Sequence, residues 1–143
     1  MLGYWQRPAE EAEVFRGDWF VGGDLARLDP DGYVIHCGRA NDIMKALGYR
    51  VAPQEVEAVL AEHPSVAEVA CAEVQVRADV SVIGAFIIAR EGAPRDAEGI
   101  KQFAAGRLAA YKCPREVVFL DALPRTANGK LRRGDLKAWR PKG

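Results

Sequence analysis

The sequence predicts an α+β fold: a small mixed or antiparallel sheet with helices on one side, preceded by a β-hairpin segment. Two observations support this prediction. After residue 41, strand-like and amphipathic segments follow one another in the order β-α-β-β-α-β-loop-α, which is typical of a sheet covered by helices. One strand-like segment ends in eight consecutive apolar residues, 82–89, as expected for a central strand beneath helices.

The first 38 residues are predicted to form β structure. Two strand-like stretches flank Asp-Pro-Asp-Gly at residues 29–32, and proline and glycine at these positions favour a tight hairpin. A unit of this size has little core to bury, so we expect residues 1–38 to be poorly anchored by themselves.

The next segment, residues 43–53, is short and strand-like, and it is broken at Gly48. A helix is predicted over residues 53–64, because Pro53 suits the first helical position and the proline after His63 ends the helix. The apolar face of this helix is formed by Val56, Val59 and Leu60.

Two strands are predicted over residues 66–76 and 80–89, separated by a three-residue turn. A helix over residues 96–111 follows, with Asp96 as its N-cap. The apolar face of this helix is formed by Ile100, Phe103, Ala104 and Leu108. A third strand is predicted over residues 116–120.

The C-terminal tail, residues 124–143, contains a lysine loop and a short helix near residues 134–139. Its seven lysines and arginines stand against one aspartate, so the tail carries +6 and the rest of the chain −6, although the whole chain is neutral. A basic end on a neutral protein suggests one localised anionic partner rather than a general nucleic-acid binder. The alternative is a plain solvated tail, and the arginines around the lysine loop are expected to be surface charge.

Composition and cysteine use exclude several classes of protein. With 49% hydrophobic and 28% charged residues, the chain has the composition of an ordinary globular protein. The cysteines Cys37, Cys71 and Cys113 form no CxxC pair, so neither a metal site nor a disulfide framework is expected, and buried free thiols fit a cytoplasmic protein. No signal peptide is visible, and the longest apolar run is too short to span a bilayer.

Lys130 closes the stretch "PRTANGK". A phosphate-binding P-loop would need glycine in place of Pro124 and serine or threonine in place of Leu131, so that interpretation fails. The basic run contains a single aromatic residue and no nucleic-acid readout motif. Asn128-Gly129 is a strong turn pair, so the loop would present the Lys130 ammonium at a defined point, where it suits a phosphate or carboxylate oxygen.

Three further residues are candidate ligands of a diol or an anion. Asp24 follows two glycines and could accept two hydrogen bonds from a ribose, although a turn residue of the hairpin is an equal alternative. Arg39 and Arg50 each closely follow a glycine and offer guanidinium groups, with surface charge as the alternative.

Together, "GGDLARLDPDGYVIHCGR", "ANDIMKALGYRVAPQEVE" and "PRTANGK", in this order, resemble the end of the adenylate-forming (AMP-binding) superfamily. Its members are acyl-CoA synthetases, adenylation domains of peptide synthetases and luciferases. Residues 1–40 resemble the closing β segment of the large N-terminal adenylation domain, which ends at a hinge. Residues 41–143 resemble the mobile C-terminal domain, which carries a catalytic lysine.

The resemblance implies an AMP-forming acid–thiol ligase, most like an acyl-CoA synthetase of fatty-acid metabolism. In such enzymes a carboxylate attacks the α-phosphate of ATP, which gives an acyl-adenylate and pyrophosphate with Mg²⁺ present. The C-terminal domain then rotates, and the thiol of coenzyme A displaces AMP. By position, Lys130 would bridge the carboxylate and phosphate oxygens in the first step, where a preplaced cation stabilises the charge that develops between two anions.

The resemblance also implies roles for the other candidates. Asp24 would hold the ribose hydroxyls with help from Arg39, and Arg50 would lie near the nucleotide phosphate. Gly48 would line the channel that admits the coenzyme A thiol. Asn41 stands at the hinge position, where aspartate or lysine is usual, and asparagine tolerates the varied backbone angles of a pivot.

The phosphate loop and acyl pocket of the family lie upstream of residue 1, so we expect a C-terminal piece that is inactive alone and lacks its N-terminal domain. Gly23 stands where threonine is usual, which implies a different nucleotide contact beside Asp24. A lysine acyltransferase is a further implied partner, because acylation of Lys130 would remove the charge that the first step needs. Two alternatives remain: a peptide-synthetase adenylation fragment, and a non-enzymatic interaction module with a basic tail.

Overall fold

The computed structural model of the chain describes residues 15–16, 19–20 and 24–141. The chain divides into two compact units, Met1–Asn41 and Asp42–Gly143. The boundary expected from the sequence lies one residue earlier, between residues 40 and 41. The roles assigned to the two parts, a closing segment and a mobile domain, stay predictions.

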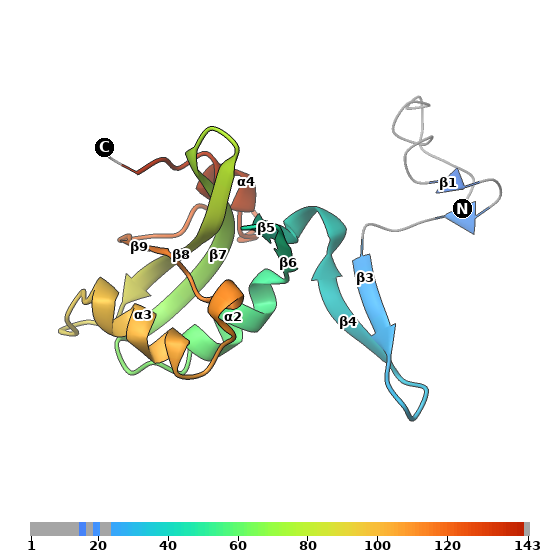
Figure 1. Cartoon of the computed structure of the whole chain (residues 1–143), viewed down its shortest axis with the longest axis horizontal. Helices are drawn as coiled ribbons and strands as arrows, with labels where there is room; N and C mark the ends of the chain where they lie inside the picture. The colour runs from blue at the N-terminus through green and yellow to red at the C-terminus, as the bar shows by residue number, and fades with distance from the viewer. Residues whose placement is uncertain (1–14, 17–18, 21–23, 142–143) are drawn as a thin grey trace. The chain divides into compact units, whose positions relative to one another are not determined.

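The first unit contains short antiparallel strand pairs (Figure 1). The pairs are β1 (Phe15–Arg16) with β2 (Trp19–Phe20), and β3 (Asp24–Leu28) with β4 (Val34–Arg39). Asp29 closes the turn between β3 and β4: its carbonyl accepts a hydrogen bond from the Gly32 amide at 3.1 Å, and its carboxylate accepts one from the Tyr33 amide at 2.9 Å. The predicted hairpin is therefore confirmed.

The second unit is built on a mixed three-stranded sheet. Its strands, in sheet order, are β7 (Val66–Arg77), β8 (Val80–Ala89) and β9 (Glu116–Phe119). β8 pairs with β7 antiparallel and with β9 parallel, so the apolar strand is central, as the sequence predicts. The parallel pairing requires a crossover connection, which is provided by the helical segment between β8 and β9.

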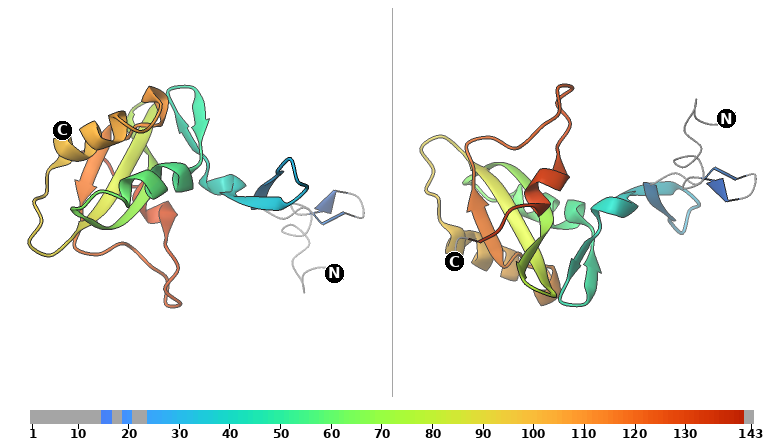
Figure 2. Two further views of the ribbon diagram at one scale, coloured as in Figure 1. Left: turned by 90° about the horizontal axis from the view of Figure 1, so that it is seen from below. Right: turned by 90° about the horizontal axis from the view of Figure 1, so that it is seen from above.

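Two helices, α2 (Pro53–Leu60) and α3 (Ala97–Ala105), cover one face of this sheet (Figure 2). As predicted, α2 begins at Pro53 and α3 is capped by Asp96, whose carboxylate accepts a hydrogen bond from the Gly99 amide at 3.0 Å. The smaller elements of the unit are the hairpin of β5 (Met44–Ala46) and β6 (Tyr49–Val51) and the 3-10 helix η2 (Ala110–Lys112). The main core joins these helices, the hairpin and the sheet through Met44, Val51, Val56, Leu60, Cys71, Ile83, Ile87, Ile100 and Ala104.

Both helices end earlier than the sequence predicts. α2 ends at Leu60 rather than residue 64, because the chain turns from Ala61 onward and the His63 amide donates to the Leu60 carbonyl at 3.1 Å. α3 ends at Ala105 rather than residue 111, because Gly106 follows and glycine is a poor helix former that commonly ends helices. In the described part of the chain, no helix is long and apolar enough to cross a membrane.

The short helix α4 (Arg133–Lys137) packs on the opposite face of the sheet (Figure 2). Its Leu136 is buried, and nearby the Trp139 ring meets the Phe86 ring edge-on, with centroids 5.9 Å apart. The predicted fold class, an α+β domain with a small mixed sheet, is confirmed. The predicted one-sided arrangement holds for α2 and α3, whereas α4 closes a second, smaller core because Leu136 has an apolar surface to cover there.

Candidate functional site

Lys130 lies on a loop whose backbone is closed on itself. Arg125 and Leu131 form an isolated antiparallel bridge at the base of the loop. Within it, the Thr126 amide donates to the Lys130 carbonyl at 2.7 Å, and the Gly129 amide donates to the Thr126 carbonyl at 2.9 Å. Gly129 has a φ of +82°, a left-handed conformation in which a side chain would be strained. The predicted turn is confirmed, although its hydrogen bond spans residues 126–129.

The Lys130 side chain is exposed, and its loop projects from the body of the second unit in both views of Figure 2. The Lys130 amide donates to the Thr126 hydroxyl at 3.2 Å, which fixes the backbone beneath the side chain. Among the residues that the structure describes, no carboxylate forms an ion pair with the Lys130 ammonium. The loop therefore presents the Lys130 ammonium, unpaired among the described residues, on a backbone that hydrogen bonds hold in place.

Arg125 anchors the loop before the turn. Its guanidinium pairs with the Glu68 carboxylate of β7 at 2.6 Å and also donates to the Gly129 carbonyl at 3.0 Å. The Arg125 and Glu68 side chains are 44% and 52% exposed, so solvent weakens the attraction between them. This pair orients the first half of the loop without burying charge.

Arg133 anchors the loop after the turn, and its side chain is only 14% exposed. It donates to both carboxylate oxygens of Glu57 on α2, at 2.5 and 3.2 Å, and to the Cys71 carbonyl of β7 at 2.7 Å. Glu57 also accepts a hydrogen bond from the Cys71 amide at 2.8 Å. The Nε atom of Arg133 lies 3.7 Å from a carboxylate oxygen of Asp42. A planar guanidinium suits such a partly buried, bidentate arrangement.

The expectation that the arginines around Lys130 are surface charge is wrong for Arg133. Its main partner, Glu57, lies 76 residues earlier in the chain, so no local pattern joins the two. One signal was present: on a helix, Glu57 lies beside Pro53 and Leu60, which are buried, so its carboxylate needs a partner inside the unit.

Gly48 lies in the two-residue turn between β5 and β6. Leu47 and Gly48 have φ values of +51° and +85°, and two consecutive residues of positive φ suit a tight hairpin turn. A Cβ atom at Gly48 would meet nothing within 4 Å. Within this chain, glycine is therefore favoured by backbone conformation rather than by lack of room, and the role in a thiol channel stays a prediction.

A cleft of about 410 Å³ lies beside the Gly48 turn. It is lined by Lys45, Leu47, Gly48, Glu73, Asp79, Val80 and Ser81. The Lys45 amide donates to the Glu73 carboxylate at 3.0 Å, and the Leu47 amide donates to the Ser81 carbonyl at 3.4 Å. These bonds tie the hairpin to β7 and β8, so the cleft has walls on both elements.

Arg50 and Lys45 are cross-strand partners in the same hairpin, and both are exposed. Like charges directly opposite one another are unfavourable unless solvent or an anion lies between them. The two cations therefore form a small positive spot, which the Glu73 carboxylate borders at the Lys45 amide. The predicted role of Arg50 near the nucleotide phosphate stays a prediction.

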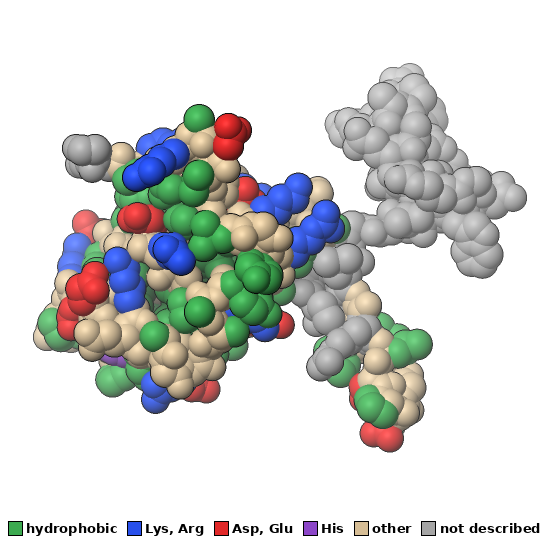
Figure 3. All heavy atoms as spheres, in the orientation of Figure 1, with side chains coloured by type: hydrophobic (Ala, Val, Ile, Leu, Met, Phe, Trp, Pro, Cys, Tyr) green, Lys and Arg blue, Asp and Glu red, His purple; other side chains and the backbone are tan. Residues whose placement is uncertain are grey.

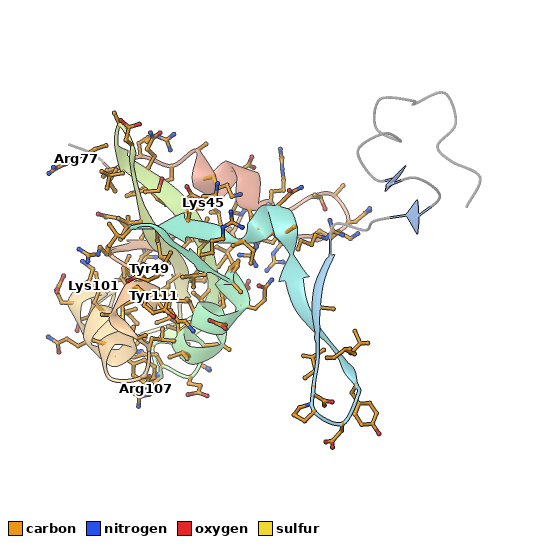
Figure 4. All side chains as sticks on the ribbon, turned by 45° about the vertical axis from the view of Figure 1, so that its right-hand side comes forward. Lys45, Tyr49, Arg77, Lys101, Arg107 and Tyr111 are labelled. Carbon is orange, nitrogen blue, oxygen red and sulfur yellow. The ribbon has the colours of Figure 1, made fainter. Side chains whose placement is uncertain are left out.

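Tyr49 of β6 and Tyr111 of η2 stack on the surface of the second unit (Figure 4). Their ring centroids are 4.4 Å apart, and the ring planes differ by 21°. Next to Tyr111, Lys112 pairs with the Glu55 carboxylate at 2.9 Å, and this hydrogen bond raises the pKa of Lys112. The aromatic stack thus fastens the hairpin that carries the Gly48 turn.

Cys71 and Cys113 are free thiols. Burial raises the pKa of the Cys71 thiol, and the Glu57 carboxylate adds to this effect. Burial also raises the pKa of Cys113, which is half-buried. The expectation of buried free thiols is thus met by Cys71 and in part by Cys113, while the Cys37 side chain lies outside the described side chains.

The remaining predicted site residues belong to the first unit. Asp24 begins β3 and Arg39 ends β4, and the two are paired in the register of the hairpin. Arg39 is exposed, whereas the side chain of Asp24 and the whole of Gly23 lie outside what the structure describes. Asn41, the predicted hinge, is in the 3-10 helix η1 (Ala40–Asp42) and is the last residue of the first unit.

Charged side chains of both signs are mixed on the described surface that is in view in Figure 3. Three cations of the basic tail, Arg125, Arg132 and Arg133, pair with carboxylates. Within residues 15–16, 19–20 and 24–141, no group of three or more His, Cys, Asp or Glu side chains could hold a metal ion.

Comparison with known proteins gives consistent matches. The profile of the family described as AMP-binding enzyme C-terminal domain matches residues 55–130. The chain is 42% identical over 140 residues to 2-succinylbenzoate–CoA ligase of Geobacillus kaustophilus (strain HTA426), a match that covers 98% of this chain and 29% of that protein.

Solved structures match over nearly the whole chain. ATP-bound MatB from Rhodopseudomonas palustris matches with a TM-score of 0.86 and 34% identity, over 95% of this chain and 27% of that one. The o-succinylbenzoate CoA synthetase MenE from Bacillus subtilis, in complex with its acyl-adenylate intermediate, matches with a TM-score of 0.85 and 34% identity, over 98% and 28%. This chain therefore spans 27–29% of the length of the relatives named here.

Proposed function

The chain belongs to the family of AMP-binding enzyme C-terminal domains, and from this premise we propose that it is the C-terminal part of an AMP-forming acyl-CoA synthetase. The complete enzyme would convert a carboxylate, ATP and coenzyme A into acyl-CoA, AMP and pyrophosphate. The observation that supports this most is the exposed Lys130 ammonium, uncommitted among the described residues, on a loop anchored by Arg125 and Arg133.

In the first step the role of Lys130 is electrostatic. The substrate carboxylate attacks the α-phosphorus of ATP, a P–O bond forms to the carboxylate, and the bond to pyrophosphate breaks. Two anions must approach for this to happen, and negative charge gathers on the α-phosphate oxygens. An ammonium held between these groups offsets their repulsion and stabilises the transition state, without a proton transfer.

In the second step the chain would contribute the turn at Gly48. The thiolate of coenzyme A attacks the acyl carbon, a C–S bond forms, and AMP leaves. The bare backbone at Gly48 would line the path of the thiol, and the positive spot of Lys45 and Arg50 suits phosphate groups. Asp24 and Arg39, paired across the first-unit hairpin, would hold the ribose of the nucleotide.

Mg²⁺ would enter as part of the ATP substrate. The described residues offer no cluster of carboxylates, histidines or cysteines that fits a resident metal ion. ATP itself carries phosphate oxygens of the kind that Mg²⁺ prefers. This chain therefore contributes cations toward the nucleotide and not metal ligands.

Two alternatives have less support. An interaction module with a basic tail would present several free cations, whereas three of the tail's cations, Arg125, Arg132 and Arg133, are each paired with a carboxylate. A peptide-synthetase adenylation fragment would pass its acyl group to a carrier domain. The curated relative named above is a CoA ligase, which supports coenzyme A as the acceptor.

Two further parts of the proposal concern the cellular setting. We also propose that the complete enzyme acts in the cytoplasm, where ATP and coenzyme A are available and where free thiols such as Cys71 stay reduced. A lysine acyltransferase would inactivate it by acylating Lys130, since an amide at Nζ carries no charge. Peptide mass spectrometry after incubation with an acyltransferase tests this, and modification elsewhere but never at Lys130 would refute it.

The function is tested in the protein that joins this chain to an N-terminal adenylation domain. A panel of carboxylates is screened by ATP–pyrophosphate exchange, with Lys130→Ala and Arg132→Ala measured beside the unaltered protein. Lys130→Ala should lower exchange by at least about 100-fold, because one preorganised charge is lost from the transition state. Arg132→Ala removes a neighbouring cation that pairs only with Asp135 among the described residues, so it should leave exchange unchanged.

Two outcomes would contradict the proposal. One is undiminished exchange in Lys130→Ala, which would show that the ammonium is not needed for adenylation. The other is pyrophosphate release from ATP and a carboxylate by the 143-residue chain alone, because the proposal places most of the active site in the N-terminal domain.

A further inference from the structure

Arg133 connects the lysine loop to three separate parts of the second unit. It lies three residues after Lys130 and is the first residue of α4. Its side chain reaches Glu57 on α2, the Cys71 carbonyl on β7 and, through Nε, the carboxylate of Asp42. Asp42 is the first residue of the second unit and directly follows Asn41, the predicted hinge.

The contacts of Arg133 differ in strength. Toward Glu57 it makes two hydrogen bonds, and the side chains are 14% and 18% exposed, so this pair is strong and shielded from water. Toward Asp42 the closest charged atoms are 3.7 Å apart, and the Asp42 side chain is 29% exposed. One edge of the guanidinium is therefore fixed, while the contact at Nε is weaker and more readily made or broken.

We propose that Arg133 is a positioning residue for Lys130, and that it couples the lysine loop to the conformation of the chain at Asp42. Held by Glu57, Arg133 fixes the end of the loop that follows Lys130. When the backbone changes direction beside Asn41, the Asp42 carboxylate moves toward the Arg133 guanidinium or away from it. The orientation of the Lys130 loop then depends on the backbone conformation at Asn41 and Asp42. This inference rests on the proposed function, in which Lys130 serves only one of the two steps.

A merely structural Arg133 would behave differently. It would hold α2, β7 and α4 together through Glu57 and the Cys71 carbonyl, and it would have no need of Asp42. Removing the charge of Asp42 would then leave the stability of the turn that carries Lys130 unchanged. Energetic coupling between Asp42 and this turn, transmitted by Arg133, is therefore the quantity that separates the two roles.

The test is a double-mutant cycle in the 143-residue chain with amide hydrogen exchange as the readout. Asp42→Asn keeps the shape of the side chain and removes its charge. Arg133→Lys keeps the charge and removes the planar fork, so that Glu57 loses its bidentate partner. Exchange is measured at loop amides that donate hydrogen bonds around the turn, those of Thr126, Gly129 and Lys130.

Arg133→Lys should speed exchange at these loop amides by about tenfold, and Asp42→Asn by about threefold, because each change frees the end of the loop. The double variant should be no faster than Arg133→Lys alone, since the Asp42 effect passes through Arg133. Arg132→Gln is the matched control. Its side chain is 56% exposed and pairs with Asp135, so exchange at the loop amides should change by less than about twofold.

Two results would overturn the inference: Asp42→Asn leaves exchange at the loop amides unchanged, or the two single effects multiply in the double variant. Unchanged protection of the β8 amides in every variant shows that the fold is intact. In the protein with an adenylation domain, Asp42→Asn should lower kcat of adenylation without changing KM for ATP, and adding it to Arg133→Lys should have no further effect.

The outcome is separable from that of the proposed function. If Lys130→Ala retains ATP–pyrophosphate exchange, the proposed function fails, and the inference, which rests on it, fails too. If Lys130→Ala abolishes this exchange while Asp42 and Arg133 act independently on the loop amides, the function stands and the inference alone is refuted.

Discussion

The two loops that carry the candidate site residues of the second unit are held in place by different means. The Lys130 loop is held by side chains, with Arg125 on Glu68 before the turn and Arg133 on Glu57 after it. The turn at Gly48 is held by its backbone, through two consecutive residues of positive φ. Its hairpin is fastened from outside by the aromatic stack on Tyr111.

The difference follows from what each loop presents. The Lys130 loop is anchored by two arginines whose carboxylate partners, Glu68 and Glu57, do not pair with the Lys130 ammonium. A turn that offers bare backbone needs a glycine conformation and no side chain at all. Substitutions should therefore affect the Lys130 loop through electrostatics and the Gly48 turn through backbone strain.

The largest effect on stability is expected for Glu57→Gln. This change leaves the nearly buried Arg133 charge without its main partner, and we expect the free energy of unfolding to fall by about 3 kcal/mol. Urea denaturation of the chain, followed by tryptophan fluorescence, measures the loss.

Glu68→Gln is the matched control, because it removes the equivalent partner of Arg125 at the other end of the loop. That pair is about half-exposed, so we expect a loss of at most about 1 kcal/mol. Equal losses in the two variants would contradict the distinction between a buried and an exposed anchor.

Gly48→Ala should destabilise the hairpin by about 1 kcal/mol or slightly more, because an L-residue is strained at a φ of +85°. Gly134→Ala is the control, since Gly134 lies within α4, does not have a positive φ and has open space around it. Alanine there should be neutral or stabilising. Thermal unfolding compares the two, and a tolerated Gly48→Ala would sink the backbone argument.

Tyr111→Ala removes the stack on Tyr49, and we expect a local loss of about 1 kcal/mol. Exchange of the Leu47 amide, which donates to the Ser81 carbonyl, reports the loosening of the hairpin. Tyr33→Ala is the control, because Tyr33 is 72% exposed and belongs to the first unit. If both variants left the Leu47 amide unchanged, the stack would have no anchoring role.

Thiol labelling is expected to show the smallest effect. It probes the surroundings of Cys71, whose carbonyl accepts a hydrogen bond from Arg133. At about pH 8, iodoacetamide should modify Cys113 slowly and Cys71 not at all in the folded chain, because a raised pKa leaves little reactive thiolate and Cys71 is also buried. Raising the pH increases the thiolate fraction, so labelling of Cys113 should accelerate. Rapid labelling of Cys71 in the folded chain would show that this region opens.

Local patterns in the sequence predict much of the fold. The start of α2 at Pro53, the cap of α3 at Asp96 and the central position of β8 all depend on neighbouring residues, and each is confirmed. The helix ends are less well predicted, because Gly106 and the turn after Leu60 outweigh the apolar spacing that continues beyond them.

The candidate site is predicted less completely. The turn that presents Lys130 follows from local turn chemistry, and the structure confirms it. The anchors at Glu57 and Arg133, and the stack of Tyr49 on Tyr111, join residues far apart in the chain. Such contacts depend on tertiary packing, and the sequence signals them at most through the position of Glu57 on the buried face of α2.

A comparison of partial reactions tests most directly the division of work between the two loops. In the protein with an adenylation domain, ATP–pyrophosphate exchange and the conversion of preformed acyl-adenylate to acyl-CoA are measured for Lys130→Ala and Gly48→Leu. We predict that Lys130→Ala loses adenylation and keeps thioester formation, whereas Gly48→Leu keeps adenylation and loses thioester formation. Loss of the same step in both variants, or full retention of adenylation in Lys130→Ala, would contradict this account.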